Sequence, residues 1–232
     1  WFGDWENNPE EASKVVNPNT GEPLVVYHGT DAEFNVFDRN ELGYHTYSNA
    51  SNLFYGMTAG VGHWFNNQNL NETIDYGKRG IGAFLNIREP GHFYSVSDLA
   101  VDIEYSGFIP EDKRELWDFD DTQEISNLVN EYVADLKDNQ DKDGLIVNDE
   151  EYGGISYVAF DANQIKSATD NSGAFSADDD SILHQDARGM FDRMGNTIAL
   201  LKNADASTFI HEFGHFELET MSRIERDLRG IP

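Results

Sequence analysis

The sequence predicts an α+β protein that has a strand-rich body and a helical C-terminal segment. Short apolar runs bounded by turn formers predict strands up to about residue 175, and one amphipathic stretch within this body predicts a helix. Helical spacing of apolar residues returns after an acidic stretch. We therefore divide the 232 residues into a body over 1–175, an acidic linker over 176–188 and a helical segment over 189–232.

The elements of the body follow from local patterns. The turn formers of "NPNTGEP" lead into "LVVYHGT", an apolar run that predicts a buried strand ending at Gly29. Residues 31–62 show little periodicity and are interpreted as a long loop. Further strands are predicted at "GHWFN", "IGAFLNI", "DGLIVND" and "SYVAF".

Two stretches carry helical spacing. Between Asp121 and Asp138, the apolar residues Ile125, Leu128, Val129, Tyr132, Val133 and Leu136 fall on one helical face. The polar, acidic run "SATDNSGAFSADDDS" marks the linker. Beyond it, helical periodicity predicts helices over Met190–Leu201 and from Thr208 onward.

The charge balance narrows the classes of partner. The chain has 43 acidic and 16 basic residues, a formal charge of −27, which repels phosphate backbones and anionic membranes. We therefore expect neither a nucleic acid nor a membrane as a partner. The absence of cysteine excludes disulfides and thiolate sites, and it fits a reducing compartment such as the cytoplasm. Both ends resemble the interior of a longer chain, so we expect neighbouring domains in a larger, polyprotein-like protein.

The stretch "STFIHEFGHFELE" contains the zinc-protease motif H-E-x-x-H. On a helix, His211 and His215 lie one turn apart and can bind one zinc ion, with Glu212 as the general base. Catalytic zinc needs a third protein ligand, and the extended motif with a later glycine and histidine is not met. The motif therefore indicates the opening part of a zinc peptidase. The alternative is an amphipathic helix with two incidental histidines.

Four stretches of the body, in order, resemble the ADP-ribosyltransferase-like domains of polyvalent proteins from phages and mobile elements. They are "SKVVNPNTGEPLVVYHGT", "GHWFNNQNLNETIDYG", "DGLIV" and "YVAFDANQIKSATDNSGAF". The Tyr-His-Gly-Thr strand end is similar to the first motif of the diphtheria-toxin and poly-ADP-ribose polymerase type. The resemblance implies a split β-sandwich around a cleft for NAD and transfer of ADP-ribose to a protein acceptor. The "STFIHEFGH" segment resembles the metallopeptidase domain that follows in such proteins.

The resemblance also implies roles for individual residues. His28 would hydrogen-bond a ribose hydroxyl of NAD, and the backbone of Gly29, next to Thr30, would hold the nicotinamide amide. Tyr76 would stack on the nicotinamide ring. Three further residues occupy places that line the site in the family: Trp64, Phe65 and Gln164, of which the aromatic pair belongs either to the pocket or only to the core.

The third motif departs from the family pattern. Polymerase-type enzymes have a glutamate at the start of the strand that precedes D-x-x-Q, and this sequence has Ser156 there. A serine cannot supply negative charge to an oxocarbenium-like transition state. Glu151, on the preceding loop, is the nearest substitute together with Glu150. The alternative is a domain that has kept the fold and lost the chemistry, acting as a binding or scaffold module.

A calcium loop is a competing interpretation of Asn139–Glu150. Its spacing of oxygen-bearing residues and its glycine match an EF-hand loop. However, its first position is Asn rather than Asp, and a strand pattern rather than a helix follows. We therefore favour a strand of the transferase-like body at "DGLIV".

The H-E-x-x-H motif generates the first testable prediction. The chain should bind about one zinc ion, and His211→Ala should abolish binding because a single imidazole holds zinc poorly. Metal content after dialysis, measured by plasma mass spectrometry, checks this, with His92→Ala as a matched control. If the wild-type chain binds no zinc, the zinc-site interpretation is wrong and the two histidines are incidental residues of an amphipathic helix.

Overall fold

A computed structural model describes residues 2–42, 53–68, 77, 79–111, 122–149, 154–168, 178–183, 189–192 and 197–200. The chain forms two compact units. The first takes in Trp1–Thr169 and Ala177–Ile182, and the second takes in Asp170–Ser176 and Leu183–Pro232.

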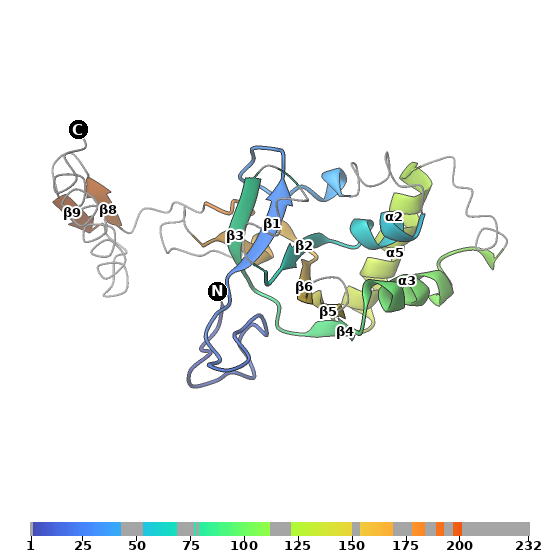
Figure 1. The fold of residues 1–232 in the computed structure, drawn as a ribbon, viewed down its shortest axis with the longest axis horizontal. Helices are drawn as coiled ribbons and strands as arrows, with labels where there is room; N and C mark the ends of the chain where they lie inside the picture. The colour runs from blue at the N-terminus through green and yellow to red at the C-terminus, as the bar shows by residue number, and fades with distance from the viewer. Residues whose placement is uncertain are drawn as a thin grey trace. The chain divides into compact units, whose positions relative to one another are not determined.

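A seven-stranded sheet, mostly antiparallel, is the framework of the first unit (Figure 1). Its strands are β1 Val26–Thr30, β2 His63–Asn66, β3 Arg79–Leu85, β4 Pro90–Phe93, β5 Gly144–Asp149, β6 Gly154–Ala159 and β7 Ile165–Ser167. They lie in the order β4-β5-β6-β2-β1-β3-β7, and β4 pairs with β5 in parallel while the other neighbours are antiparallel. The strands predicted at "LVVYHGT", "GHWFN", "IGAFLNI", "DGLIVND" and "SYVAF" are confirmed.

The junction between β1 and β2 divides this sheet into two halves. Those strands share one registered pair, Tyr27 with Asn66. Their outer neighbours pair far more extensively, with β1 and β3 in register from Val26–Ala83 to Thr30–Arg79. We call this junction the seam. Where the resemblance implied a split β-sandwich, the first unit has one mostly antiparallel order of seven strands that narrows to a single registered pair at the seam.

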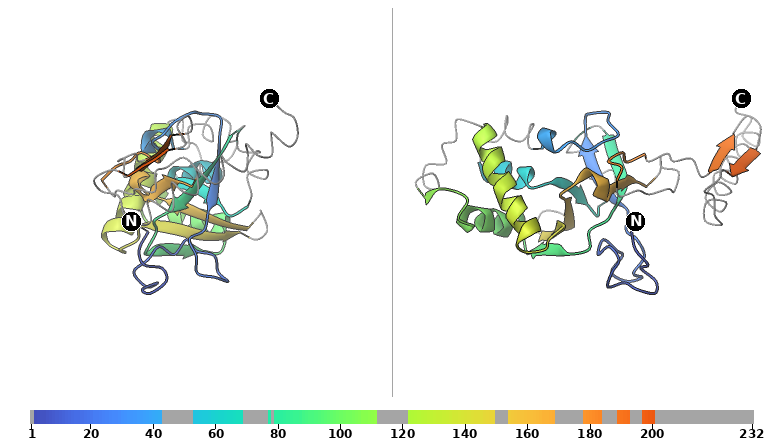
Figure 2. Two further views of the ribbon diagram at one scale, coloured as in Figure 1. Left: turned by 90° about the vertical axis from the view of Figure 1, so that its left-hand side faces the viewer. Right: turned by 180° about the vertical axis from the view of Figure 1, so that it is seen from behind.

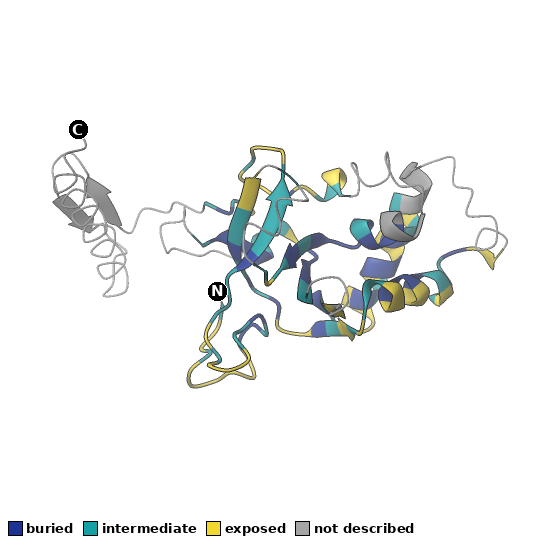
Figure 3. Ribbon diagram, in the orientation of Figure 1, coloured by how far each residue is buried: buried dark blue, intermediate teal, exposed yellow. Residues whose placement is uncertain are grey.

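Helices cover one half of the sheet. They are α2 Leu53–Gly60, α3 Val96–Tyr105 and α5 Thr122–Asp138, and they lie together beside β4-β5-β6-β2, away from β1 and β3 (Figures 1 and 2). Apolar faces of the helices and of β5 and β6 form one core (Figure 3), which contains Met57, Leu99, Ile103, Val129, Tyr132, Val133, Leu136, Leu145, Val147, Val158 and Phe160. The amphipathic pattern predicted over Asp121–Asp138 is thus confirmed as α5.

The loop predicted over 31–62 is wrong in its last part, which contains α2. Glycines at 56 and 60 and the polar residues before position 53 hide the helical pattern in the sequence. Tertiary packing overrides this weak local signal, because Met57 is buried in the core under α5. A short 3₁₀ helix, η1 Arg39–Glu41, also lies in this range, and Asp38 caps it.

Part of the acidic stretch interpreted as a linker packs on the first unit. Ser181 pairs with Val36, and the backbone N–H of Ile182 donates to the carbonyl of Asn35 at 2.8 Å. Lys166, fully buried on β7, donates from Nζ to the carbonyl oxygens of Asp179 and Ser181. Burial lowers the pKa of Lys166, and the nearby aspartates oppose this shift. We call this arrangement the Lys166 clasp.

The helix predicted over Met190–Leu201 is wrong within the described residues of the second unit. Strands β8 Gly189–Asp192 and β9 Thr197–Leu200 pair there as an antiparallel ladder. The sequence between them contains Gly195 and Asn196, a pair of turn-forming residues that favours a hairpin over a continuous helix. The helix predicted from Thr208 onward lies outside the described residues.

The Lys166 clasp predicts a stability difference between two lysines. Lys166→Met should lower the free energy of unfolding by about 2 kcal/mol, because two partly buried carbonyls lose a charged donor. Lys137→Met is the matched control, since Lys137 forms an exposed ion pair with Asp161 and should cost less than about 1 kcal/mol. Urea unfolding followed by circular dichroism measures both. Equal losses would show that the clasp adds nothing to stability.

Candidate functional site

The first motif lies on β1, at the seam. The imidazole of His28 reaches across the seam, and its Nδ1 lies 2.8 Å from the carbonyl oxygen of Trp64 on β2. A carbonyl oxygen can only accept a hydrogen bond, so Nδ1 carries the proton. In the neutral ring, Nε2 is then an acceptor.

Burial lowers the pKa of His28 below the ordinary 6.5, and the hydrogen bond to Trp64 opposes this shift. The ring is therefore neutral at pH 7, with its tautomer fixed by the bond to β2. A neutral Nε2 that accepts is suited to a hydroxyl donor and not to an anionic group.

Two aromatic rings contact the imidazole of His28. Phe37 meets the imidazole edge to face, with ring centroids 5.1 Å apart at 80°, and Phe65 lies 5.5 Å away at 48°. Phe37 also contacts His63, at 5.1 Å and 62°, and Phe34, at 4.8 Å and 80°. These five rings come from β1, from the segment after it and from β2. We call them the ring cluster.

Glycine backbone and a turn frame the end of β1. Gly29 pairs with Gly80 of β3, so no side chain stands at that step of the ladder and a flat group can approach the backbone closely. The hydroxyl oxygen of Thr30 accepts from the N–H of Ala32 at 3.1 Å, which holds the turn after the strand.

Tyr76 lies outside the described residues, but Gly77 lies against the first motif. Gly77 has φ +150°, and a Cβ there would overlap the backbone of Thr30. Any other residue at 77 would push the chain away from the motif. Gly77, the end of "IDYG", therefore lies against the end of the Tyr-His-Gly-Thr strand.

Ser156, at the place of the expected glutamate, lies two strands away from the first motif. It pairs with Asn66 of β2, which in turn pairs with Tyr27 of β1. At the usual strand spacing, the Cα atoms of Tyr27 and Ser156 are about 10 Å apart. The side chain of Asn67 fixes the start of β6 by accepting from the N–H of Ile155 at 3.2 Å.

The aromatic pair on β2 divides its roles between the two faces of the strand. Phe65 is buried and belongs to the ring cluster. Trp64 packs against the helical core, and its Nε1 donates to the carbonyl of Thr58 at 3.0 Å. Trp64 therefore contributes its backbone carbonyl to the site by holding His28.

Gln164 has its hydrogen-bonding capacity used within the fold. Its side-chain oxygen accepts from the N–H groups of Phe160 and Asp161, at 3.0 and 2.9 Å. Its side-chain nitrogen donates to the carbonyls of Asn86 and Asp143, at 3.0 and 2.7 Å. The amide thus joins three segments of the first unit and has no donor or acceptor left over for a substrate.

The structure does not support the competing interpretation of Asn139–Glu150 as a calcium loop. Residues 144–149 form β5 in an extended ladder, where an EF-hand loop would curl around an ion. The carboxylate of Asp143 accepts from the N–H groups of Arg88 and Glu89, at 2.8 and 2.9 Å, so it joins the chain before β4 to β5.

A cavity of about 630 Å³ lies beside the ring cluster, on the side of Phe37 and His63. Phe37, Arg39, His63, Phe160 and Asp161 are among the residues that line it. Arg39 donates from Nη1 to the carbonyls of Val61 and Phe160, at 3.2 and 3.1 Å. His28 is not in the lining, whereas Phe37 both lines the cavity and contacts the His28 ring. Sequence reasoning missed both Phe37 and His63, since only their spatial pairing marks them.

Several predicted site residues lie outside the described residues. They are Glu151, Glu212, His211 and His215, together with Tyr76. Glu151 falls in the connection between Asp149 and Gly154, which pair with each other at the end of the β5–β6 ladder. Within the described ranges, no group of three histidine or acidic side chains could hold a metal ion. No helix in those ranges is long and apolar enough to cross a membrane.

A comparison with family models identifies the class of domain that this sheet and its strand-end histidine belong to, which is an ADP-ribosyltransferase type. The model described as "ADP-Ribosyltransferase in polyvalent proteins" matches residues 18–175. The chain therefore belongs to this family, and the resemblance drawn from its four stretches is confirmed at that level. Neither the curated proteins nor the solved structures gave a match.

The buried His63 predicts a specific loss of stability in acid. Burial, together with the charges of His28 and Arg39, lowers its pKa from 6.5 to about 4, against the effect of Asp161 and Asp38. The unfolded chain takes up this proton below pH 6.5, whereas the folded chain resists it to about pH 4. The stabilisation is therefore complete above pH 6.5 and is lost as the pH falls toward 4.

Between pH 7 and pH 5, the wild type should lose about 2 kcal/mol more unfolding free energy than His63→Asn, which cannot titrate. Urea unfolding at the two pH values measures this difference. His92→Asn, at an exposed histidine, is the control and should behave as the wild type. The explanation fails if the His63→Asn and wild-type losses are the same.

Proposed function

We propose that the chain uses NAD to transfer ADP-ribose to a protein acceptor. The observation that carries this proposal is the neutral His28 with an acceptor Nε2, held across the seam beside the Gly29–Gly80 step. Family membership over residues 18–175 supports the same class of reaction. In this reaction the bond between ribose C1′ and the nicotinamide nitrogen breaks, and its electron pair leaves with nicotinamide. A nucleophile of the acceptor bonds to C1′ and releases a proton.

Each residue of the first motif has a defined task in this scheme. His28 Nε2 accepts from a ribose hydroxyl and fixes the sugar as positive charge develops at C1′. The backbone of Gly29, next to Thr30, pairs with the nicotinamide amide, and Tyr76 stacks on its ring. Phe65 lines the site through the ring cluster. We propose that Glu151 supplies the negative charge that the oxocarbenium-like state needs. It belongs to the connection between β5 and β6, which leads directly into the strand that carries Ser156.

The position of Ser156 favours a second candidate function. By the sequence resemblance, Ser156 stands where the family has its glutamate, and a hydroxyl supplies no negative charge. If Glu151 does not replace that charge, the domain binds NAD without turning it over and acts as a scaffold within a larger protein. The H-E-x-x-H motif is a separate proposal for a zinc peptidase, carried by the sequence alone.

Nicotinamide release from NAD by the purified chain tests the proposal. His28→Ala should lower the rate by about 100-fold or more, because the sugar loses its fixed partner in the transition state. His92→Ala, which removes an exposed histidine from β4, is the matched control and should leave the rate unchanged. Release that survives His28→Ala would remove the site assignment.

Ser156→Glu separates the two candidates in the same assay. An active wild type that changes little on this substitution supports Glu151 as the source of charge. A wild type that binds NAD without release, and gains release as Ser156→Glu, supports the degenerate module.

A further inference from the structure

Phe37 occupies a position that no motif of the first unit explains. It is 5% exposed and lies in the segment after β1, which has no regular structure at this point. Its ring contacts both histidines of the ring cluster, at 5.1 Å each, and it also contacts Phe65, at 5.4 Å. One side chain therefore packs between His28 and His63 and forms the wall toward the cavity.

The backbone on both sides of Phe37 is held. On the N-terminal side, Asn35 accepts from Ile182 and Val36 pairs with Ser181, a segment that the Lys166 clasp fixes in turn. On the C-terminal side, Arg39 donates from Nε to Asn130 of α5 at 3.0 Å and from Nη1 to two backbone carbonyls. A side chain anchored from both directions keeps one orientation, as positioning of a catalytic group requires.

The imidazole needs such a neighbour. The χ2 angle of histidine has a broad, roughly two-fold energy profile, so the bond to Trp64 alone allows the ring to turn over and place a carbon where Nδ1 was. An edge-to-face contact resists that turn, because the imidazole must leave its plane and swing against the Phe37 ring before it can turn over.

We propose that Phe37 is a positioning residue for His28, which keeps the imidazole in the Nδ1–H tautomer and aims Nε2 at the ribose. The effect on the tautomer stands on the geometry alone. The effect on turnover rests on the proposed function. Two readouts therefore separate a failure of this inference from a failure of the proposed function.

The first readout is the tautomer of His28, by long-range ¹H–¹⁵N correlation spectra of the histidine-labelled chain at pH 7.5. The wild type should show the Nδ1–H form. Phe37→Leu, which removes the ring and keeps apolar volume, should give a mixture of tautomers. Phe37→Tyr keeps the ring and should restore the wild-type signals. Where Phe37→Leu does not fold by circular dichroism, Phe37→Met replaces it.

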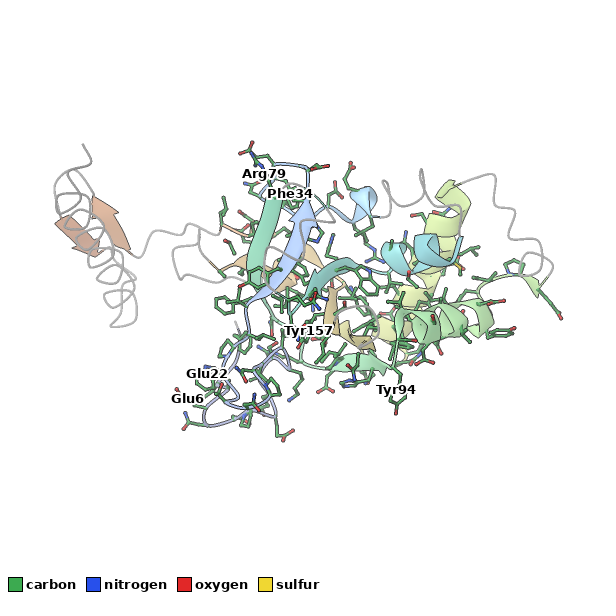
Figure 4. All side chains as sticks on the ribbon, viewed as in Figure 1. Glu6, Glu22, Phe34, Arg79, Tyr94 and Tyr157 are labelled. Atoms are coloured by element: carbon green, nitrogen blue, oxygen red, sulfur yellow. The ribbon has the colours of Figure 1, made fainter. Side chains whose placement is uncertain are left out.

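Phe34→Leu is the matched control. Phe34 lies in the same segment, beside the end of β1 (Figure 4), and its ring contacts Phe37 at 4.8 Å, with no described contact to His28. It should keep the Nδ1–H form. Unchanged His28 signals in Phe37→Leu, or equal changes in Phe34→Leu, would overturn the inference.

The second readout is nicotinamide release. Phe37→Leu should lower kcat by about 10-fold to 100-fold, with a smaller change in KM, because misplacement of a catalytic group costs the transition state most. Phe37→Tyr should recover most of kcat. Equal losses of kcat in Phe34→Leu and Phe37→Leu would make the role merely structural and contradict the proposal. If the wild type releases no nicotinamide, the tautomer spectra alone decide.

Discussion

The hydrogen bond from His28 to the carbonyl of Trp64 is the interaction on which the site depends. It joins β1 to β2 where the sheet has one registered pair, so a side chain supplies a connection that the ladder lacks. The same bond sets the tautomer of the imidazole and its direction. Because Trp64 is itself fixed to α2 through its indole N–H, the helical core and the catalytic candidate form one chain of contacts.

The residues around the motif explain why a site of this kind needs so much of the first unit. Gln164 joins the chain before β4, the start of β5 and the end of β6 through four hydrogen bonds. Lys166 fixes Asp179 and Ser181, and this segment holds the chain before Phe37. The stretch "QIKS" lies in the fourth of the stretches that resemble the family, and it is thus a set of internal connections. The side chains of Gln164 and Lys166 stabilise the fold around the first motif through these bonds.

Much of the fold was predictable because turn-forming residues separate short apolar runs. The strands that carry His28, Trp64 and Ser156 are predicted from this pattern. The amphipathic pattern of α5 was equally clear. The helix α2 gives a weak local signal because of its glycines, and the β8–β9 ladder has a helix-like pattern because four-residue stretches are too short to separate the two periods.

The residues of the candidate site also fall into two groups, those that the sequence reveals and those that only the fold reveals. A motif reveals His28, whereas the partners of Phe37 and His63 are far apart in the chain and only the fold brings them together. Gln164 shows the opposite limit, since its residue type suggested a substrate contact and its surroundings use every polar atom.

The narrow seam has a consequence for how the first unit opens. Each half of the sheet is held by its own ladders, whereas one registered pair and the His28–Trp64 hydrogen bond join the two halves, so we expect the halves to open as separate units in native-state hydrogen exchange. Amides of β5 and β6 exchange only when their own half unfolds, while those beside the seam exchange through a smaller opening. A ligand that touches both halves closes that opening, and its binding is then visible as slowed exchange at Tyr27 and Asn66.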